Sequence, residues 1–423
     1  MNLEVKKSVI SGTFCVPGSK SHTIRAVAFA TMAEGKSEIF NPLSSEDTES
    51  SLKASVVLGA EVKKEKKCWI ITGHGKNLQI SQDFADLGNS GTSLRIFSAL
   101  AALGNKKISF DGDSSLRTRK MAPLLKALEG LGAKITSSEN WTCPLSVKGP
   151  IKGGKIRMEC KSSQYLTALL IATPLLENDS EIELTLLNEK PYVEITLDWL
   201  TKMGISFNAS NDLMHFNIKG GQIYRPFKTS IPGDFSTATF PLASSAVTGG
   251  TVTLKNLDFS DKQGDKEVFY YLDKMGMKIR KDSSVTEVIP AKLSGIEIDM
   301  NSTPDALPAM AVIGCFADGK TILKNVPQAR MKETDRIASM TCELRKMGAN
   351  VEEFEDGMAI SKSQLHGTEL ESYGDHRIAM ALAIAAMGAN GKSVIKNAEC
   401  SSVTYPAFFD DFKNCGANFS FLS

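Results

Sequence analysis

Six short polar motifs recur along the chain about every 71 residues, and each precedes an alanine-rich apolar stretch. A fixed long period indicates one structural unit that is repeated. Each motif places Ser, Thr, Asp or Asn beside Gly or Pro just ahead of a helical run, which is the pattern of a helix N-terminus. Because helix N-termini offer unpaired N–H groups and partial positive charge, several that point into one space favour an anion. The motifs are GSKSHTIR at Lys20, NSGTSLR at Gly91, KSSQ at Ser163, PGDFST at Asp234, STPDA at Asp305 and GDHR at His376.

A second marker supports the same repeat. Each unit carries a later helical stretch that ends in an apolar residue and Gly, followed by a short strand-like pair. A Gly there fits the left-handed residue that closes a helix. The spacings between these glycines are 73, 72, 72, 72 and 68 residues, and the glycines are 59, 132, 204, 276, 348 and 416. The unit is therefore predicted to read helix, strand, helix, strand, with less regular pieces between.

The 423 residues predict two or three domains, and six units divide most simply into two groups of three. The best boundary lies in YRPFKTSIPG, near residues 224–232. We expect the N-terminal strand before Pro17 to pair with the far half of the chain, which would make the connection a double crossover and a natural hinge. The predicted domains are residues 1–18 plus 232–423, closed by the N-terminal strand, and residues 19–231.

Composition excludes several classes of protein. The net charge of +1 argues against a partner nucleic acid or a polybasic membrane surface. Apolar runs are interrupted before they reach transmembrane length, and the start MNLEVKK has no apolar signal core, so we expect a soluble cytoplasmic protein. The eight cysteines are scattered without CxxC or a partnered His spacing, which predicts neither a zinc site nor a disulfide framework.

Basic residues gather near the repeated motifs and indicate a ligand with several negative charges. Arg suits bidentate contact with carboxylate or phosphate, and Lys serves as a mobile point charge and a possible proton donor. Lys332 and Arg336 are four residues apart, and on a helix their side chains would share a face. The basic residues near the motifs are Lys20, Arg25, Arg95, Arg119, Lys332, Arg336 and Arg377. Any one of them alone would usually be a solvated surface residue, but their equivalent places in six repeats favour function.

Two carboxylates are candidates for proton transfer. Asp305 and Glu333 lie among these cations in the sequence, and a carboxylate amid cations is held ionised and can accept a proton from a hydroxyl. Lys20, in the same positive field, could donate a proton. Each residue has a plainer reading as well: Asp305 as a helix cap after Pro304, and Glu333 as part of a salt-bridged helix face. In the same way, Asp375 could simply orient Arg377.

The motifs taken together resemble a known family. GSKSHTIRA, NSGTSLR, GDSSLRTR, KSSQYLTALL, KPY, TPDA, RMKETDR and GDHRIAM appear in this order. The chain closely resembles the 5-enolpyruvylshikimate-3-phosphate synthases, also called 3-phosphoshikimate carboxyvinyltransferases, over essentially its whole length. The resemblance implies an α/β (α+β) fold of two domains, each made of three βαβαββ units, with helix N-termini facing an interdomain cleft that closes on the substrates.

The resemblance also implies the reaction. Such an enzyme joins phosphoenolpyruvate to the 5-hydroxyl of shikimate 3-phosphate and releases phosphate, a step toward chorismate and the aromatic amino acids. Both substrates carry a carboxylate and a phosphate, which matches the basic residues. No metal or organic cofactor is implied, and the family suggests a monomer.

By motif position the resemblance assigns the candidate residues. Those for phosphoenolpyruvate are Lys20, Gly91, Arg119, Gln164, Arg336 and Arg377. Those for shikimate 3-phosphate are Lys20, Ser21, Arg25, Ser162, Ser163, Gln164, Asp305 and Lys332. Asp305 would take the proton of the attacking hydroxyl, and Glu333 and Lys20 are the candidates for protonating the methylene carbon.

Three positions depart from the family pattern. Glu189 stands where many members place a Ser that contacts phosphate, and because its charge would repel phosphate, we expect the contact to be absent or Glu189 to point away. Gln328 stands where many members have Asn. Val403 stands where many members carry a Lys that touches phosphoenolpyruvate, which predicts a weaker or differently shaped pocket.

Two alternatives remain beside this reading. UDP-N-acetylglucosamine enolpyruvyl transferases share the fold and the donor. Their first motif has Lys-Asn where this chain has Lys20-Ser21, and they usually carry a Cys in the loop that corresponds to residues 111–119, where this chain has none. A non-catalytic anion-binding protein on the same scaffold is the second alternative. Retention of Lys20, Asp305, Glu333 and Arg377 argues against it.

Overall fold

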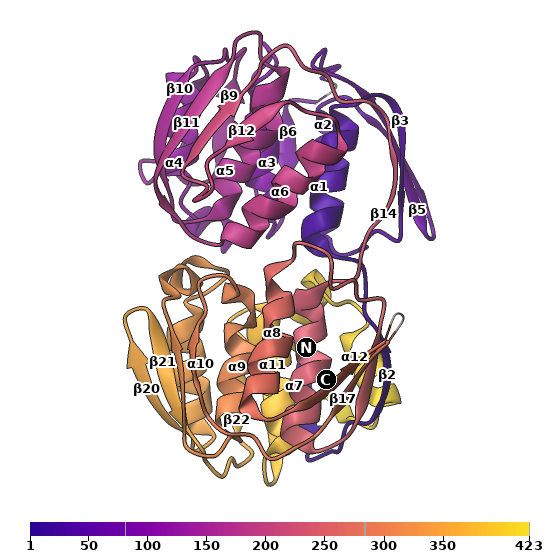
Figure 1. Ribbon diagram of the computed structural model, residues 1–423, viewed down its shortest axis with the longest axis vertical. Helices are drawn as coiled ribbons and strands as arrows, with labels where there is room; N and C mark the ends of the chain where they lie inside the picture. Colours follow the sequence, from indigo (N-terminus) through magenta and orange to yellow (C-terminus); the bar gives the residue numbers. More distant parts are fainter. Residues whose placement is uncertain (81, 283–284, 423) are drawn as a thin grey trace. The chain divides into compact units, whose positions relative to one another are not determined.

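The chain divides into two compact units, and each is described by itself. We analysed a computed structural model that describes residues 1–80, 82–282 and 285–422. Unit 1 consists of Met1–Pro17 and Pro232–Ser423, and unit 2 is Gly18–Ile231 (Figure 1). Among the described residues, strands form six four-stranded sheets, three in each unit. No helix of the described part is long and apolar enough to cross a membrane.

Unit 2 contains three copies of one βαβαββ repeat. The first copy comprises β14 (Lys228–Ser230), α1 (Lys20–Thr31), β3 (Glu34–Phe40), α2 (Glu46–Val57), β4 (Glu61–Glu65) and β5 (Cys68–His74). The second comprises β6 (Phe84–Asp86), α3 (Gly91–Ala101), β7 (Ile108–Asp111), η1 (Leu116–Thr118), α4 (Ala122–Gly130), β8 (Lys134–Thr136) and β9 (Leu145–Lys148). The third comprises β10 (Lys155–Cys160), α5 (Ser163–Ala172), η2 (Thr173–Leu175), β11 (Ser180–Leu187), α6 (Lys190–Lys202), β12 (Phe207–Ala209) and β13 (His215–Ile218).

Unit 1 contains three further copies of the repeat. The fourth comprises β2 (Gly12–Cys15), α7 (Phe235–Thr248), β15 (Val252–Lys255), η3 (Gly264–Lys266), α8 (Glu267–Met275), β16 (Lys278–Lys281) and β17 (Val285–Ile289). The fifth comprises β18 (Glu297–Asp299), η4 (Pro304–Ala306), α9 (Leu307–Gly314), β19 (Lys320–Lys324), η5 (Pro327–Met331), α10 (Arg336–Lys346), β20 (Asn350–Phe354) and β21 (Gly357–Ser361). The sixth comprises β22 (Glu369–Glu371), α11 (His376–Gly388), β23 (Lys392–Lys396), η6 (Ala398–Val403), α12 (Phe408–Asn414), β24 (Asn418–Leu422) and β1 (Asn2–Lys6).

All six sheets have the same pairing. The order β10-β11-β13-β12 is typical: β10 and β11 are parallel across a helical crossover, and the other two pairs are antiparallel. Segments distant in sequence complete three of the sheets. β1 lies between β23 and β24, β2 pairs with β15, and β14 pairs with β3. The N-terminal strands therefore belong to unit 1, and the last strand of unit 2 belongs to its first repeat.

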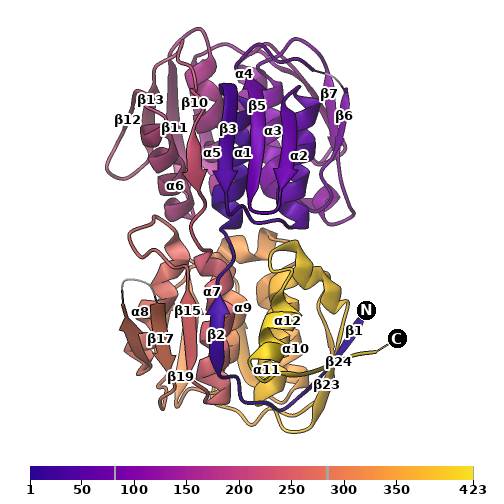
Figure 2. The ribbon, with the colours of Figure 1, turned by 90° about the vertical axis from the view of Figure 1, so that its right-hand side faces the viewer.

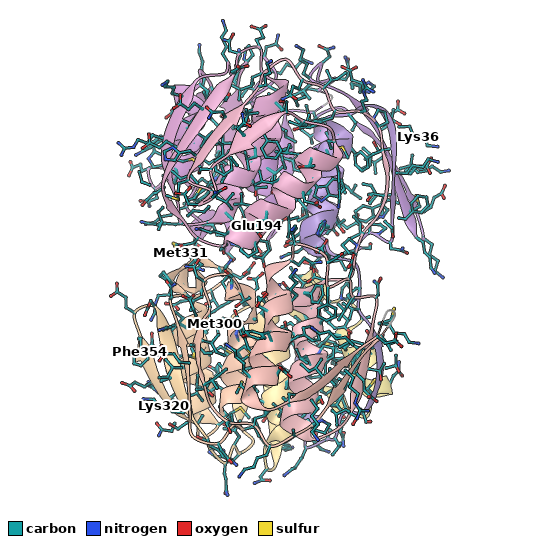
Figure 3. The ribbon with its side chains drawn as sticks, viewed as in Figure 1. Lys36, Glu194, Met300, Lys320, Met331 and Phe354 are labelled. Carbon is teal, nitrogen blue, oxygen red and sulfur yellow. The ribbon has the colours of Figure 1, made fainter. Side chains whose placement is uncertain are left out.

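The core of each unit is a group of three helices surrounded by the sheets (Figure 2). The first helix of each repeat is buried nearly all round, whereas the second helix is amphipathic. For example, α11 is buried from His376 to Met387, but α8 buries only Val268, Phe269, Leu272 and Met275. Exposed charged side chains lie on the sheets, where Lys320 of β19 pairs with Glu352 of the edge strand β20 at 3.0 Å (Figure 3).

The predicted helix starts are confirmed. Each repeated motif precedes a buried first helix, and Ser or Asp side chains cap most of them. Asp375 of GDHR accepts hydrogen bonds from the backbone N–H groups of Arg377 and Ile378 at the start of α11. The predicted helix ends are confirmed as well, because the glycines that follow the second helices have φ between +71° and +110°. They are Gly59, Gly132, Gly204, Gly276, Gly348 and Gly416.

Candidate active site

The first predicted site residue begins α1. The Ser19 side chain caps this helix, and Lys20 is its first residue. The Lys20 ammonium group lies 3.0 Å from the Asp47 carboxylate, and both side chains are mostly buried. Asp47 sits in the first turn of α2, where an acidic residue also favours the helix start. Asp47 was not among the predicted site residues; its place two residues after the Ser45 cap was the available signal.

Arg25 lies inside unit 2 rather than on its surface. Its guanidinium donates to the Thr196 hydroxyl at 2.9 Å, the Thr167 hydroxyl at 3.3 Å, and the carbonyls of Tyr192 at 2.8 Å and Ser21 at 3.0 Å. These acceptors are uncharged, and burial lowers the pKa of Arg25 to about 10. The group is still a cation at neutral pH, and it ties α1 to α5 and α6.

Two guanidinium groups converge at the start of α3. A Cβ atom added to Gly91 would lie 2.7 Å from Arg95 Nη1 and 2.9 Å from Arg119 Nη1. Arg119 donates to the Asn89 amide oxygen and to the Ser115 hydroxyl. Two like charges beside a helix N-terminus create a positive field that an anion would relieve. Because Gly91 has no side chain, the ends of both guanidinium groups can lie close to the N-terminus of α3.

The Gln164 side chain is oriented by a neighbour from another helix. Arg95 Nη1 donates to Gln164 Oε1 at 2.6 Å, and the Arg95 guanidinium also lies 5.3 Å from the centre of the Tyr165 ring. Because the amide oxygen is taken by a cation, the amide NH₂ of Gln164 is left to donate to other groups. Sequence analysis noted Arg95 among the cations but did not predict this contact.

Ser163 holds an anion that belongs to the chain itself. Glu189 Oε2 accepts hydrogen bonds from the Ser163 backbone N–H at 3.1 Å and from its hydroxyl at 2.8 Å. The Glu189 side chain is 1% exposed. Of the two expectations for this position, the one that Glu189 points away is wrong, since its carboxylate lies at the N-terminus of α5, beside the predicted phosphate ligand Ser163. The other, that a phosphate contact at Glu189 is absent, stays a prediction.

Unit 1 gathers its candidate residues around Asp305. Asp305 Oδ1 lies 2.8 Å from Arg336 Nη1 and 3.7 Å from Lys332 Nζ, and Asp305 Oδ2 lies 3.1 Å from Arg377 Nη2. Asp305 lies after Pro304 inside the 3₁₀ helix η4, whose N-cap is Thr303, and the N-cap of the following α9 is Ala306, so Asp305 caps neither helix. The plain reading of Asp305 as a helix cap is thus replaced by a carboxylate bound to three cations.

Arg336 is the most enclosed cation of this group, with 1% of its side chain exposed. It contacts Asp375 Oδ2 at 2.8 Å and Glu333 Oε2 at 2.6 Å, besides Asp305. Burial acts to lower the pKa of Arg336, but the charges of Asp375, Glu333 and Asp305 outweigh it and raise that pKa. Asp375 therefore positions the Arg336 side chain, and it touches Arg377 through that residue's backbone N–H.

The helical argument for Lys332 and Arg336 is wrong. α10 begins at Arg336, and Lys332 lies before it in non-helical backbone with ψ of −149°. The two side chains nevertheless meet, because both point to Asp305. The segment also carries Met331, which is 47% exposed (Figure 3). Arg330 anchors it by contacting Asp335 at 2.7 Å and Glu353 at 2.8 Å.

Asp265 is a further carboxylate that sequence analysis did not select. It receives a hydrogen bond from the Ser236 hydroxyl and is 2% exposed. Burial raises the pKa of Asp265 to about 6, with the Asp305 charge as a second cause and Arg377 opposing it. The sequence signal was its place in QGDK, a Gly-Asp pair ahead of a helix like those in PGDFST and GDHR.

Two of the departures from the family pattern lie in buried positions. Gln328 donates from its amide nitrogen to the Asn301 carbonyl at 2.9 Å, in η5. Val403 ends η6 and is 6% exposed. Both residues thus fill space inside unit 1.

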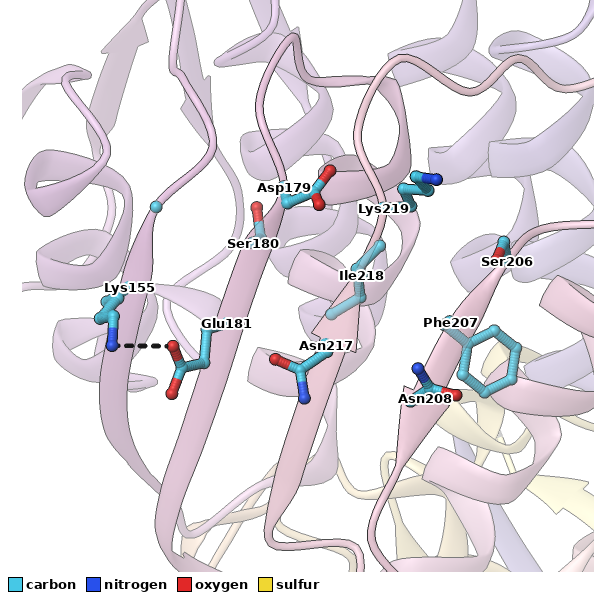
Figure 4. Close-up of a pocket in the computed structure, with 11 residues that line it drawn as sticks. Lys155, Asp179, Ser180, Glu181, Ser206, Phe207, Asn208, Asn217, Ile218 and Lys219 are labelled. Atoms are coloured by element: carbon cyan, nitrogen blue, oxygen red, sulfur yellow. Dashed lines mark ion pairs between the residues drawn. The ribbon is translucent and has the colours of Figure 1, made fainter.

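A surface hollow elsewhere in unit 2 contains none of the predicted residues. It has a volume of about 480 Å³ and lies along the sheet β10-β11-β13-β12 (Figure 4). Lys155 and Glu181, which are among its lining residues, pair with each other at 3.0 Å. Lining groups of both charges, partly satisfied by one another, do not favour an anionic ligand here.

Comparisons with known proteins identify the family. The model for EPSP synthase (3-phosphoshikimate 1-carboxyvinyltransferase) matches residues 5–412. A 3-phosphoshikimate 1-carboxyvinyltransferase of Acetivibrio thermocellus is 49% identical over 421 residues, which is 99% of each chain. One of Ruminiclostridium cellulolyticum is 47% identical over the full length of both chains.

Solved structures agree with the sequence comparisons. An EPSP synthase from Acinetobacter baumannii has a TM-score of 0.82 and 26% sequence identity, and the match covers 99% of this chain and 100% of that one. The predicted fold class, two domains of three βαβαββ repeats, is confirmed. The repeats, the clustered cations and these relatives together show that the chain belongs to the EPSP synthase (3-phosphoshikimate 1-carboxyvinyltransferase) family.

Proposed function

We propose that this enzyme uses the residues described above to transfer the carboxyvinyl group of phosphoenolpyruvate to the 5-hydroxyl of shikimate 3-phosphate. The reaction is that of its family, a transferase step of the shikimate pathway to aromatic amino acids. The observation that carries the assignment of roles is the position of Asp305, whose two carboxylate oxygens lie within 3.1 Å of two guanidinium groups.

Asp305 is proposed as the base. A hydroxyl group that approaches this carboxylate would find an acceptor fixed by Arg336 and Arg377 rather than one that must be ordered first. The same guanidinium groups are suited to negative charge on a carboxylate or a departing phosphate, and such electrostatic help is largest when the donors are already in place. Lys332, 3.7 Å from Asp305, would contact the hydroxyls or the phosphate of the same substrate.

The remaining roles follow motif position and the local geometry. For phosphoenolpyruvate we propose Lys20, Gly91, Arg119, Gln164, Arg336 and Arg377. For shikimate 3-phosphate we propose Lys20, Ser21, Arg25, Ser162, Ser163, Gln164, Asp305 and Lys332. The convergence of Arg95 and Arg119 on Gly91 supports an anion there, as does the orientation of Gln164, whose amide oxygen is held by Arg95.

The proposed chemistry has two stages. The 5-oxygen forms a bond to carbon 2 of phosphoenolpyruvate while its proton passes to Asp305, and carbon 3 receives a proton from Glu333 or Lys20. This gives a tetrahedral adduct that keeps the phosphate. The C–O bond to phosphate then breaks while the departing phosphate takes the proton held by Asp305. The new methyl group returns a proton to the group that donated it, Glu333 or Lys20, and the vinyl ether and inorganic phosphate result. The two stages together, and not either one alone, return the protein groups to their starting protonation.

We also propose that residues of both units act on the same pair of substrates, with the two chain crossings as the hinge. A monomer in the cytoplasm is the simplest setting for this proposal. Sedimentation equilibrium checks the monomer, and a mass that rises with protein concentration would contradict it.

Phosphate release from the purified protein tests the reaction. We expect release that requires phosphoenolpyruvate and shikimate 3-phosphate together, with each substrate alone as the control. UDP-N-acetylglucosamine in place of shikimate 3-phosphate should give no release, because the comparisons support only the shikimate reaction. Release with the nucleotide sugar, or binding without turnover, would overturn the assignment.

The Asp305→Asn variant tests the base. The amide keeps the size and one acceptor oxygen but cannot take up the proton, so kcat should fall by a factor of about 10² to 10⁴. Binding of shikimate 3-phosphate, measured by calorimetry, should persist. A variant that retains kcat within tenfold would exclude Asp305 as the base.

A further inference from the structure

Glu189 occupies hydrogen-bond donors that the proposed function assigns to a substrate. Its carboxylate accepts from both donors of Ser163, the backbone N–H at 3.1 Å and the hydroxyl at 2.8 Å. Ser163 is the first residue of α5, so the carboxylate also lies in the field of the helix N-terminus. Such a position is where a phosphate or carboxylate of a ligand would bind.

The backbone holds Glu189 there at a conformational cost. Its φ of 59° lies in the left-handed region, which costs roughly 1–2 kcal/mol for a residue with a Cβ. Glu189 is the second residue after β11; in four other repeats a left-handed residue directly follows the second strand, and there it is Asn, which tolerates this conformation better. These residues are Asn41, Asn256, Asn325 and Asn397. A strained backbone that places a buried charge indicates a functional position.

The side chain can move without the backbone. The Glu189 carbonyl accepts from the Tyr192 N–H at 3.1 Å in the first turn of α6, and Glu189 is the N-cap residue of that helix. These contacts involve main-chain atoms, and they stay when the carboxylate swings away from Ser163. A ligand could therefore take the two Ser163 donors while α5 and α6 keep their places.

We propose that Glu189 determines substrate specificity, because its carboxylate competes with the phosphate of shikimate 3-phosphate for the N-terminus of α5. This inference rests on the proposed function of Ser162 and Ser163. Two like charges cannot share the Ser163 donors, so binding the phosphorylated substrate requires that these two charge-assisted hydrogen bonds be broken. Shikimate, which lacks the phosphate, does not require it. Glu189 therefore weakens the binding of shikimate 3-phosphate but not that of shikimate, which reduces the ratio of the two affinities.

The test is a calorimetric titration of the full-length protein with shikimate 3-phosphate and, separately, with shikimate. Two variants remove the charge: Glu189→Gln keeps an acceptor for Ser163, and Glu189→Ser supplies a hydroxyl. We expect both to bind shikimate 3-phosphate about tenfold more tightly or better, with a change below threefold for shikimate. The matched control is Glu181→Gln, which makes the same charge change on an exposed side chain of the same repeat (Figure 4). It should leave both affinities within twofold.

Unchanged or weaker binding of shikimate 3-phosphate by folded Glu189→Gln would overturn the proposal. An equal gain for shikimate would do so too, since the phosphate would then not be the competitor. If the variants do not fold, a crystal structure of the wild-type protein with shikimate 3-phosphate decides instead. We expect the phosphate on Ser163 and the Glu189 carboxylate moved away; an intact Glu189–Ser163 contact contradicts the competition. Phosphate release by the wild type tests the reaction separately, so the two failures are distinguishable.

Discussion

Arg336 should be essential for the stability of unit 1, and the variant Arg336→Met tests this. The methionine fills similar space but leaves three carboxylates without their shared cation. Asp375 is the most affected, because its side chain is fully buried, whereas Glu333 and Asp305 keep 11% and 15% exposure and some access to water. Removing one partner of a buried ion pair costs about 3–5 kcal/mol.

That free energy converts into a measurable melting shift. For a domain of about 200 residues, 1 kcal/mol corresponds to roughly 2–4 °C in Tm. The ellipticity midpoint of Arg336→Met should therefore fall by about 6–20 °C. All three tryptophans, at positions 69, 141 and 199, lie in unit 2, so fluorescence follows that unit alone. We expect the ellipticity change to precede the fluorescence change in this variant.

Arg280→Met is the matched control in the same unit. Arg280 contacts Glu287 at 3.4 Å, with 75% and 40% of the two side chains exposed. Exposed pairs contribute about 0–1 kcal/mol, so its melting shift should stay below roughly 4 °C. If Arg336→Met melts within the range of this control, the three carboxylates do not depend on Arg336 and the reasoning is refuted.

Three further variants test other features of the site. Gly91→Ala should raise the Kd for phosphoenolpyruvate by about 10-fold or more with little change in Tm, because its Cβ displaces the mobile ends of Arg95 and Arg119; an unchanged Kd by calorimetry contradicts this. Burial raises the pKa of Asp265 from an ordinary 3.8 to about 6 in the folded protein, so the stabilisation that its protonation gives is fully present below pH 4 and is lost as pH rises through 6. In urea titrations at pH 8, the free energy of unfolding of Asp265→Asn should therefore exceed that of the wild type by ~3 kcal/mol at most. At pH 4 the two proteins should have equal free energies of unfolding. Equal values at both pH values would exclude the raised pKa. Val403→Lys should bind phosphoenolpyruvate more tightly in calorimetry but melt at a lower temperature, since Val403 is 6% exposed and a buried ammonium is costly; equal or weaker binding counts against the pocket predicted there.

Local patterns in the sequence were enough to predict the repeats and their ends. The capping role of Asp375 and the left-handed backbone of Gly348, for example, depend on the few residues around each of them. Because such features depend only on neighbouring residues, the sequence was enough to identify which residues begin the six helices and which cations lie near them. Lys332 does not share a helix with Arg336, because α10 begins at Arg336 and the helical spacing does not extend across that boundary.

Patterns along the chain were enough to establish the six-fold repeat and the residue types that gather at the helix starts, and with the family resemblance they also gave the fold class. The pairing of these groups depends on the tertiary structure: Lys20 pairs with Asp47, Arg336 pairs with Asp375, and Glu189 accepts hydrogen bonds from Ser163. These partners are 27, 39 and 26 residues apart and come from different elements of the fold. Periodicity and capping are properties of a few consecutive residues, whereas an ion pair depends on how separate helices pack. That packing is set by the burial of all their apolar faces together.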